Sequence, residues 1–296
     1  MERVIAGRSP VRHGLCLLGL ALGLVAVPFA PAMAAADGKV DVALVLGVDV
    51  SWSMDHHEQL IQRDGYAAAF RSKEVINAIR NGAYGKVAVT YVEWAGATTQ
   101  ITVVPWTVID GAAAAQRFAD ALKMQEPMTL RRTSISGAID FARKELGSSG
   151  FTAMRRIIDI SGDGPNNDGR SVTAARDEAV KAGITINGLP LMTNTAGSYG
   201  GMPPEDLDQY YTDCVIGGGQ AFVIPVTSWA QFPKAVRRKL VLELAGTVAP
   251  DSVIDDAGNE NLPVIRVQAT APKATPGCES GEGLWRPRNT PSKPKP

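Results

Sequence analysis

The sequence predicts an α/β fold, with a doubly wound, mostly parallel sheet, one antiparallel edge strand and helices on both faces. Three observations lead to this prediction. Short apolar runs alternate with longer segments of helical periodicity, which is typical of a parallel sheet covered by helices. The runs are nearly continuous, as in strands that are buried on both faces. Two of them are joined by a short glycine-containing link, which indicates a hairpin.

The elements follow one another in a regular order. Strands are expected at 42–48, 87–92, 101–104, 157–160, 184–191 and 221–226. Helices are expected at 55–80, 111–124, 134–146, 170–182 and 228–245. The second and third strands form the predicted hairpin, so the third is the antiparallel edge strand. These elements predict one domain over residues 37–248.

The composition supports a folded domain and argues against some partners. The 296 residues are 45% hydrophobic and 20% charged, which is enough apolar material for a core. Lys plus Arg and Asp plus Glu are balanced at 30 each, whereas dedicated nucleic-acid-binding proteins usually carry a basic excess. We therefore expect no nucleic-acid partner.

The N-terminal segment, residues 1–36, has the pattern of a secretory signal peptide. Basic residues precede an apolar run from Gly14 to Val27, and the small residues at 34–36 fit the cleavage rule. The run is shorter than the roughly 18 apolar residues that a membrane span needs. We expect an exported chain, periplasmic or secreted, with no transmembrane anchor once the segment is removed.

The C-terminal segment, residues 249–296, differs in composition from the domain. It is rich in proline, and only residues 263–269 could add a short strand, so we expect a largely flexible extension. Two cysteines remain after signal-peptide cleavage, Cys214 and Cys278. In an exported protein they could form one disulfide, a pairing that spacing alone leaves open.

Oxygen-bearing side chains gather after the first strand. Asp49, Ser51 and Ser53 alternate directly before the longest helix, at the carboxyl end of a buried strand. Ligands of open α/β sheets bind at this edge. Mg²⁺ prefers oxygen ligands in near-octahedral geometry and usually keeps several waters. The three side chains supply part of such a coordination shell.

Two later segments can supply further ligands. Thr133 lies where a helix begins, and Asp163 lies just past the strand at 157–160. The serines could instead cap the following helix, and Asp163 with Gly164 could form an ordinary turn. The occurrence of all three segments in order favours a metal site.

These three segments resemble the von Willebrand factor A domain and its metal-ion-dependent adhesion site, in an exported bacterial branch. The family pattern is Asp-x-Ser-x-Ser after the first strand, a lone Thr in a later loop and Asp-Gly after the fourth strand. It is matched by Asp49, Ser51, Ser53, Thr133 and Asp163. The resemblance covers about residues 40–246 and implies a Rossmann-like, three-layer fold.

The resemblance also implies a mode of binding. In such domains the serines and threonine coordinate the cation directly, and the aspartates often act through water. One divalent cation, Mg²⁺ in the first place and Mn²⁺ or Ca²⁺ as alternatives, then recruits an Asp or Glu carboxylate of a protein partner. The chain departs from the pattern at Gly162, where the family often has a hydroxyl residue.

Two other functions are considered. A metal-dependent hydrolase or phosphoesterase could use the same cation as a Lewis acid, and would need a general base, for which Glu93 and Asp168 are the candidates. No catalytic-triad elbow or phosphate-binding loop occurs in the sequence. Alternatively, the metal could only stiffen the loops around it.

Several other residues lie near the predicted site in the sequence. Four could contact a partner: Trp52, Asn166, Asn167 and Asp168. The tryptophan could equally pack under a neighbouring loop. Asp159 lies within an apolar run and needs a partner, which could be a neighbour of the metal ligands or a helix N-terminus. His56 and His57 are interpreted as a solvated helix start.

Overall fold

The computed structural model describes residues 38–193, 206–245, 263–266 and 276–279. By its contacts the chain divides into two units, Met1–Ala36 and Asp37–Pro296, and all described residues belong to the second. The predicted signal peptide and most of the predicted extension at 249–296 therefore lie outside the described residues. Within the described ranges, no helix has the length and apolar character needed to cross a membrane.

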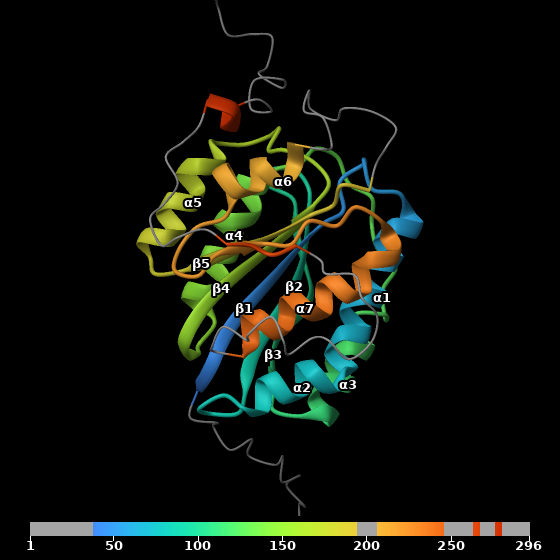
Figure 1. Ribbon diagram of the computed structural model, residues 1–296, viewed down its shortest axis with the longest axis vertical. Helices are drawn as coiled ribbons and strands as arrows, with labels where there is room; N and C mark the ends of the chain where they lie inside the picture. The colour runs from blue at the N-terminus through green and yellow to red at the C-terminus, as the bar shows by residue number, and fades with distance from the viewer. Residues whose placement is uncertain (1–37, 194–205, 246–262, 267–275, 280–296) are drawn as a thin grey trace, which may run out of the picture. The chain divides into compact units, whose positions relative to one another are not determined.

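A seven-stranded sheet in the order β3-β2-β1-β4-β5-β6-β7 forms the centre of the domain (Figure 1). The strands are β1 (Lys39–Asp49), β2 (Val87–Trp94), β3 (Gln100–Ile109), β4 (Thr152–Gly162), β5 (Thr185–Pro190), β6 (Phe222–Val223) and β7 (Ile265–Arg266). β1, β2, β4, β5 and β6 pair in parallel, and β3 pairs antiparallel to β2, which confirms the predicted sheet and hairpin. The two-residue β7 adds a second antiparallel pairing at the opposite edge.

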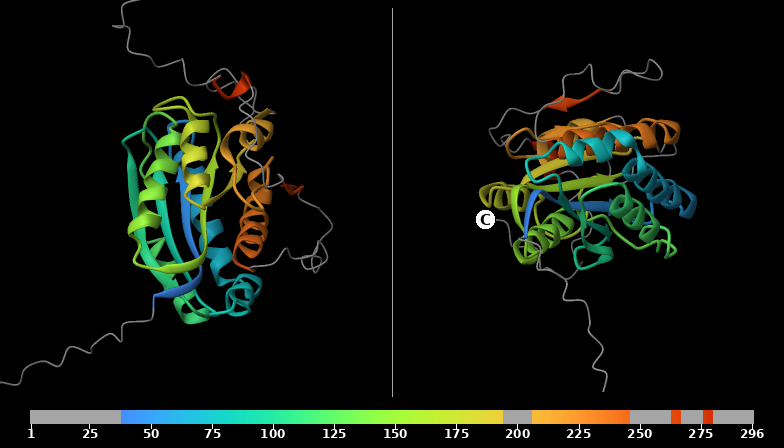
Figure 2. Two further views of the ribbon diagram at one scale, coloured as in Figure 1. Left: turned by 90° about the vertical axis from the view of Figure 1, so that its left-hand side faces the viewer. Right: turned by 90° about the horizontal axis from the view of Figure 1, so that it is seen from below.

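Helices cover both faces of this sheet (Figure 2). They are α1 (His56–Arg71), α2 (Lys73–Arg80), α3 (Ala112–Ala121), α4 (Ile135–Ser148), α5 (Val172–Lys181), α6 (Leu207–Tyr210) and α7 (Phe232–Leu244), with a π-helical turn η3 (Tyr211–Val215) and 3₁₀ turns η4 (Trp229–Gln231) and η6 (Pro276–Glu279). One apolar core lies between the sheet and α1, α2, α3 and α7. The other lies under α4, α5, α6 and η3.

The residues of β1 alternate between these two cores. Val42, Leu44 and Leu46 belong to the α1/α7 core, whereas Ala43 and Val45 belong to the α4/α5 core. This alternation is the period of two expected of a strand, and both sides of it are buried because helices cover both faces.

The predicted helix at 55–80 is divided in two at Ser72. This residue is extended, with φ −71° and ψ 147°, and its hydroxyl accepts a hydrogen bond from the Val75 N–H to cap α2. Periodicity alone did not reveal the break because serine is compatible with either role. At the other end, Asp55 and Glu58 form a capping box that fixes where α1 begins.

The connections of β1 determine where a ligand can bind. β1 is flanked by β2 on one side and by β4 on the other. The chain therefore leaves β1 toward β2 and leaves β4 toward β5, in opposite directions along the sheet. Such a switch point opens a crevice at the carboxyl edge of the sheet. Asp49 ends β1 and Asp163 follows β4, which brings both to this edge.

Candidate metal centre

Four of the five predicted ligand residues form one polar cluster at the carboxyl ends of β1 and β4. The Ser51 N–H donates a hydrogen bond to Asp49 Oδ1 at 2.7 Å. The Ser51 and Ser53 hydroxyl oxygens lie 3.1 Å apart, and the Ser53 hydroxyl donates to Asp163 Oδ1 at 2.7 Å. The segment after β1 and the segment after β4 are therefore joined through side-chain oxygens.

One carboxylate oxygen in this cluster lacks a partner. Asp49 is fully buried, and its Oδ2 makes no hydrogen bond within the described residues. An unpaired buried polar oxygen is costly, so this atom marks a position where a further group is accommodated. No ion pair in the described part of the chain involves Asp49 or Asp163, so neither carboxylate is neutralised by a basic side chain.

Gly162 allows the Asp49 carboxylate to lie this close to β4. A Cβ at position 162 would be 3.0 Å from Asp49 Oδ2 and 2.9 Å from the Tyr211 hydroxyl oxygen. The Tyr211 hydroxyl is also buried without a hydrogen-bond partner among the described residues. Where the family pattern often has a hydroxyl residue, this chain thus has Gly162, and the side chain of Tyr211 from η3 packs against the backbone of that glycine.

The loop that carries Thr133 is held to both strand ends through its backbone. The Leu130 N–H donates to the Val50 carbonyl at 2.9 Å, beside the segment that follows β1. The Thr133 N–H donates to Asn167 Oδ1 at 2.9 Å, and the Thr133 carbonyl accepts from the Asn167 N–H at 2.8 Å. In the described part of the chain, no hydrogen bond joins the Thr133 hydroxyl to the other four predicted ligands.

The backbone around Thr133 is arranged at a conformational cost. Arg132 has a φ of 72°, a left-handed conformation that costs a non-glycine residue about 1–2 kcal/mol. Its guanidinium contacts Asp168 Oδ1 at 2.6 Å, which holds the turn in place. Ser134, and not Thr133, caps α4 by accepting from the Gly137 N–H, so the Thr133 side chain is not used as the cap.

The two carboxyl groups of the cluster have raised pKa values. Burial, together with the neighbouring charge of Asp163, raises the pKa of Asp49 well above its usual range. Burial also raises the pKa of Asp163 to about 6, although the hydrogen bond from Ser53 opposes this rise. Two acidic groups in a poorly solvated place resist ionisation together, and an added cation relieves that cost.

Within the described residues there is no cluster of three or more His, Cys, Asp or Glu that could hold a metal. The predicted site has a different composition, with two carboxylates and three hydroxyls. Such a donor set contains only oxygen, which suits a hard cation such as Mg²⁺ or Mn²⁺ and gives it few charged ligands. The residues present therefore fit the group that the sequence analysis expects.

The loop after Asp163 is mostly structural, which corrects one expectation. Asn166 is fully buried, and its side chain accepts from the Ser136 N–H and donates to the Arg170 carbonyl. It therefore holds the loop and is not exposed to a partner. Asp168 likewise accepts from the Ala97 N–H at 2.8 Å, so much of its carboxylate is engaged within the chain.

Trp52 remains exposed at the rim of the cluster. Its side chain is 69% exposed, so it does not pack under a neighbouring loop. The Arg131 guanidinium lies 4.9 Å from the centre of its ring, within the range of a cation–π contact. An aromatic and a cation thus stand beside the two acidic ligands.

The carboxylates considered as general bases are both engaged elsewhere. Glu93 forms a buried ion pair with Arg63, at 2.7 Å from its Nε. For Asp168, partial burial favours the neutral acid, but hydrogen bonds from Ala97 and Arg132 prevail and lower its pKa. A general base works best with a pKa near the working pH, so the lowered pKa of Asp168 does not suit that role, and Glu93 is occupied by its ion pair with Arg63.

Asp159 adopts neither of the two arrangements expected for it. It lies on the α1/α7 face of β4, where Lys239 of α7 is its ion-pair partner, with Nζ 2.5 Å from Oδ1. His56 lies at the exposed start of α1, 3.5 Å from the carboxylate of Glu126. The histidine is therefore a surface residue, as expected.

Sequence reasoning missed the residues that support the cluster from beneath. Gln62 of α1 donates to the Asp49 carbonyl at 3.1 Å and accepts from the Ser161 hydroxyl at 3.3 Å, which joins the ends of β1 and β4. A polar stripe at helical spacing carries this role: Gln59, Gln62, Arg63 and Tyr66, all buried. Polar residues at helical spacing usually indicate the exposed face of a helix. Only the packing of α1 against the strand ends could have shown that this polar face is buried.

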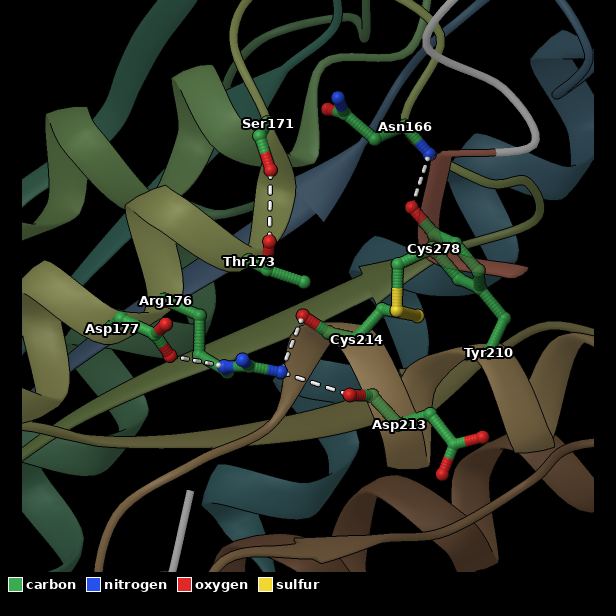
Figure 3. The surroundings of a disulfide bond; sticks show 9 residues. All are labelled: Asn166, Ser171, Thr173, Arg176, Asp177, Tyr210, Asp213, Cys214 and Cys278. Carbon is green, nitrogen blue, oxygen red and sulfur yellow. Dashed lines mark hydrogen bonds and ion pairs between the residues drawn. A yellow bond between two sulfur atoms is a disulfide. The ribbon is translucent and has the colours of Figure 1, made fainter. Parts of the chain in front are cut away.

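A disulfide joins Cys214 in η3 to Cys278 in η6 (Figure 3). Both cysteines are buried, and their separation in sequence is 64 residues. Near the bond, the Asn166 N–H donates to the Tyr210 hydroxyl at 3.1 Å (Figure 3). The disulfide therefore attaches η6 to the segment that also supports the loop after Asp163.

Comparison with solved structures shows the fold. A von Willebrand factor type A protein from Catenulispora acidiphila is 11% identical, with a TM-score of 0.50, over 70% of this chain and 43% of that one. Proximal thread matrix protein 1 from the mussel byssus is 15% identical, with a TM-score of 0.50, over 70% of this chain and 49% of that one. The same mussel protein with a zinc-occupied MIDAS motif is 16% identical, with a TM-score of 0.50, over 70% and 48%.

These similarities establish a von Willebrand factor A-like fold for the domain, and at such identities they establish the fold alone. The chain spans less than half the length of each of these structures. A family model described as "Protein of unknown function (DUF1194)" matches residues 39–248. No curated protein matches the sequence.

Proposed function

We propose, from the premise that this chain belongs to the DUF1194 family, that it is an exported, metal-dependent protein-binding module. Its site consists of Asp49, Ser51, Ser53, Thr133 and Asp163 on a von Willebrand factor A-like domain. In this proposal the site holds one divalent cation, Mg²⁺ in the first place. The cation recruits an Asp or Glu carboxylate from a protein partner.

The observation that carries the proposal is the unpaired carboxylate at the sheet edge. Asp49 Oδ2 is buried without a partner among the described residues, while its Oδ1 is fixed by the Ser51 N–H. The hydroxyls of Ser51 and Ser53 adjoin it and connect it to Asp163. Four neighbouring residues thus bring their side-chain oxygens together at the position where this proposal places the cation.

The charge of this donor set accounts for recruitment of a partner. Two carboxylates neutralise one divalent cation, and the hydroxyls of Ser51, Ser53 and Thr133 add no charge. When bound, the cation supplies an electrophilic position that an external carboxylate can fill. Trp52 and Arg131 stand at the rim, where an exposed aromatic and a cation suit a partner that carries acidic residues.

The geometry favours binding over hydrolysis. Glu93 is paired with Arg63, and Asp168 is held by Ala97 and Arg132, so both proposed bases are already engaged. A hydrolase would need another proton acceptor at the site. The mussel protein with a zinc-occupied MIDAS motif gives independent support for a divalent cation in this fold.

Export rests on the N-terminal pattern and on the disulfide. Residues 1–36 have the layout of a signal peptide, and the Cys214–Cys278 bond belongs to an oxidising compartment such as the periplasm or the exterior. Fractionation of cells that express the full chain, followed by sequencing of the N-terminus of the exported form, tests this part. Full-length protein retained in the cytoplasm would contradict it.

Calorimetric titration of Mg²⁺ and Mn²⁺ tests the metal site. The wild type is expected to bind one ion saturably, and Asp49→Asn is expected to lose this binding while it keeps the fold. Asp55→Asn is a matched control, because Asp55 is an exposed helix cap close in sequence and asparagine also caps helices. Equal binding by wild type and Asp49→Asn would contradict the site.

A second experiment separates binding from hydrolysis. Metal-loaded protein is titrated with a short peptide that carries one glutamate, and the same peptide with glutamine serves as control. Binding that requires both the metal and the glutamate supports the module. Metal-dependent turnover of a generic phosphoester, lost in Asp49→Asn, would instead support the hydrolase.

A further inference from the structure

A second group of charged side chains is buried under α7, away from the proposed metal site. Lys239 of α7 is 1% exposed, and its Nζ lies 2.5 Å from Asp159 Oδ1 and 2.6 Å from Glu243 Oε1. Asp159 lies in β4, three residues before the strand ends at Gly162, and both carboxylate side chains are fully buried. Lys239 also lies 5.7 Å from the centre of the Phe222 ring, so the ammonium group is enclosed by protein.

The cluster contains more acid than base. Two carboxyl groups contact the single amine of Lys239, and within the described residues no ion pair links Arg155, the next cation, to Glu243. Two buried carboxylates beside one ammonium group leave a net negative charge in a dry place, which is strongly unfavourable. One additional proton on the cluster removes that charge, so one carboxyl group is held as the neutral acid.

Asp159 is the group that carries this proton. Burial raises its pKa to about 7, with a further contribution from the charge of Glu243, against the attraction of Lys239. Glu243 is instead held as an acceptor, because the Asn187 amide donates to its Oε1 at 2.8 Å. The cluster therefore places an amine beside a carboxylic acid and a carboxylate.

The contact between Lys239 and Asp159 is closer than an ordinary hydrogen bond would require. Lys239 Nζ lies 2.5 Å from Asp159 Oδ1, and no other described group contacts this oxygen through a hydrogen bond. A nitrogen held this close to a carboxyl oxygen is also near the carboxyl carbon. Reacting groups that are held in contact react as if each were present at a very high concentration.

We propose that Lys239 and Asp159 react with each other in the folded protein to form an isopeptide bond between α7 and β4. The product is an amide that joins Lys239 Nζ to Asp159 Cγ. It is a covalent modification of this chain, and it does not depend on the proposed metal site.

The reaction is balanced and involves no oxidation or reduction. The Lys239 ammonium gives a proton to the Glu243 carboxylate, and the neutral amine then attacks the carbon of the Asp159 carboxylic acid. A C–N bond forms, the C–OH bond breaks, and one amine proton leaves with the hydroxyl as water. Glu243 carries protons between the nitrogen and the departing oxygen, and it ends as the neutral acid, so the products are the amide, one water molecule and a protonated Glu243 with no buried charge.

The surroundings favour this reaction at two points. The Tyr66 hydroxyl lies 3.5 Å from Asp159 Oδ2 and can donate to the oxygen that becomes negative during attack. The dry environment that penalises an ion pair has no such effect on a neutral amide, so loss of water removes buried charge. Tyr66 and Glu243 are therefore the two residues that assist bond formation.

The bond would fix the last helix of the domain to the strand that leads to Asp163. β4 carries Asp159 near its carboxyl end and ends at Gly162, directly before the proposed metal ligand Asp163. A covalent link at Asp159 prevents α7 from separating from this strand even when the surrounding packing loosens.

Peptide mapping of the purified full chain tests the proposal directly. Trypsin releases residues 157–170 as one peptide and, after Arg238, a second peptide that begins at Lys239 and extends to Arg266 when Lys239 is blocked. The expected result is a single branched species of these two peptides, lighter than their sum by one water molecule. Recovery of the two segments only as separate peptides, with cleavage after Lys239, would overturn the proposal.

Two variants make the test independent of stability. Asp159→Asn can form the same amide with loss of ammonia instead of water, so the variant is expected to give the identical branched peptide. Glu243→Gln keeps both reacting groups but removes the proton carrier, and the branched peptide is expected to be lost, with circular dichroism as the check on folding. Full linkage in a folded Glu243→Gln variant would overturn the role of Glu243.

Discussion

Two carboxyl groups of one strand segment have opposite surroundings. Asp159, within β4, meets the ammonium of Lys239 from the α7 side. Asp163, four residues further on, accepts a hydrogen bond from Ser53 and lies near the acidic groups of Asp49 and Glu58, and no basic side chain among the described residues forms an ion pair with it. Burial raises the pKa of both groups, but only Asp159 has a cation of its own.

The difference shows how the fold separates stability from binding. Inside the domain, the acidic groups of Asp159 and Glu243 are compensated by the amine of Lys239, because an unpaired buried charge is strongly destabilising. Carboxyl groups that bind an external cation, as proposed for Asp49 and Asp163, need to have no basic side chain paired with them. The domain tolerates the resulting cost of burying unpaired acidic groups at the edge of the sheet. The surroundings of Asp159 and those of Asp163 can be changed separately by substitution, metal or pH.

The largest effect is expected from Lys239→Met, which removes the amine that compensates Asp159 and Glu243 and, with it, the cross-link proposed between Lys239 and Asp159. Breaking a buried pair in this way should lower the free energy of unfolding by about 3–5 kcal/mol. Urea denaturation followed by circular dichroism measures it. Lys123→Met, which removes a surface ion pair with Asp64, is the control and should change stability by less than about 1 kcal/mol. Similar effects of the two substitutions would contradict the comparison.

Adding metal should stabilise the domain through the other carboxyl groups. At a Mg²⁺ concentration of about 100 times the dissociation constant, the free energy of unfolding should rise by about 2.7 kcal/mol. Thermal denaturation with Mg²⁺ and with a chelator measures the rise. Asp49→Asn should show none, because the ion loses its buried carboxylate. Stabilisation of this variant equal to that of the wild type would place the ion elsewhere.

The stability of metal-free protein should increase as the pH falls from about 7 to about 4. The pKa of Asp163 is raised from an ordinary value of 3.8 to about 6, so the folded state binds its proton more tightly than the unfolded state does. This contribution is fully present below pH 3.8 and is lost as the pH rises through 6; it is at most about 3 kcal/mol. The difference between wild type and Asp163→Asn, measured by urea denaturation at each pH, isolates it.

The same protonation should weaken metal binding. A carboxylate has to lose its proton to coordinate Mg²⁺, so affinity is expected to fall below about pH 6. Calorimetry at pH 5 and pH 7.5 is the measurement. An affinity that is unchanged across this range would mean that Asp163 does not take part in binding the ion.

The smallest effect on the domain itself is expected from Trp52→Ala. The side chain is 69% exposed, so the free energy of unfolding should change by no more than about 0.5 kcal/mol. Metal affinity should also remain unchanged, whereas binding of a protein partner should weaken. A large loss of stability would show that the ring supports the loop and is not a contact for a partner.

Much of the fold could be predicted from the sequence because its strands are buried on both faces. Continuous apolar runs such as those of β1 and β2 leave little ambiguity. The break between α1 and α2 was missed because one hydrogen bond to Ser72 decides it. The strand β7 has only two residues, so its place in the sheet depends on the partner β6 and not on its own pattern.

The position of the candidate residues in the fold was predictable, but the residues that support them were not. Asp49 ends β1, Ser51 follows it and Asp163 follows β4, so their place at one edge of the sheet follows from the topology. The pairing of Asp159 with Lys239 joins residues far apart in the sequence, and no spacing rule connects them. Asn166 looked like a loop residue available to a partner, and only three-dimensional packing shows that it is buried.

The bare backbone at Gly162 has a consequence for how this chain can evolve. An alanine or serine at that position would press on the Asp49 carboxylate and on the Tyr211 hydroxyl at once. The hydroxyl residue that the wider family often has there could return only with a smaller residue at 211. Positions 162 and 211 are therefore expected to covary among relatives, with glycine accompanying tyrosine and a hydroxyl residue accompanying a small side chain.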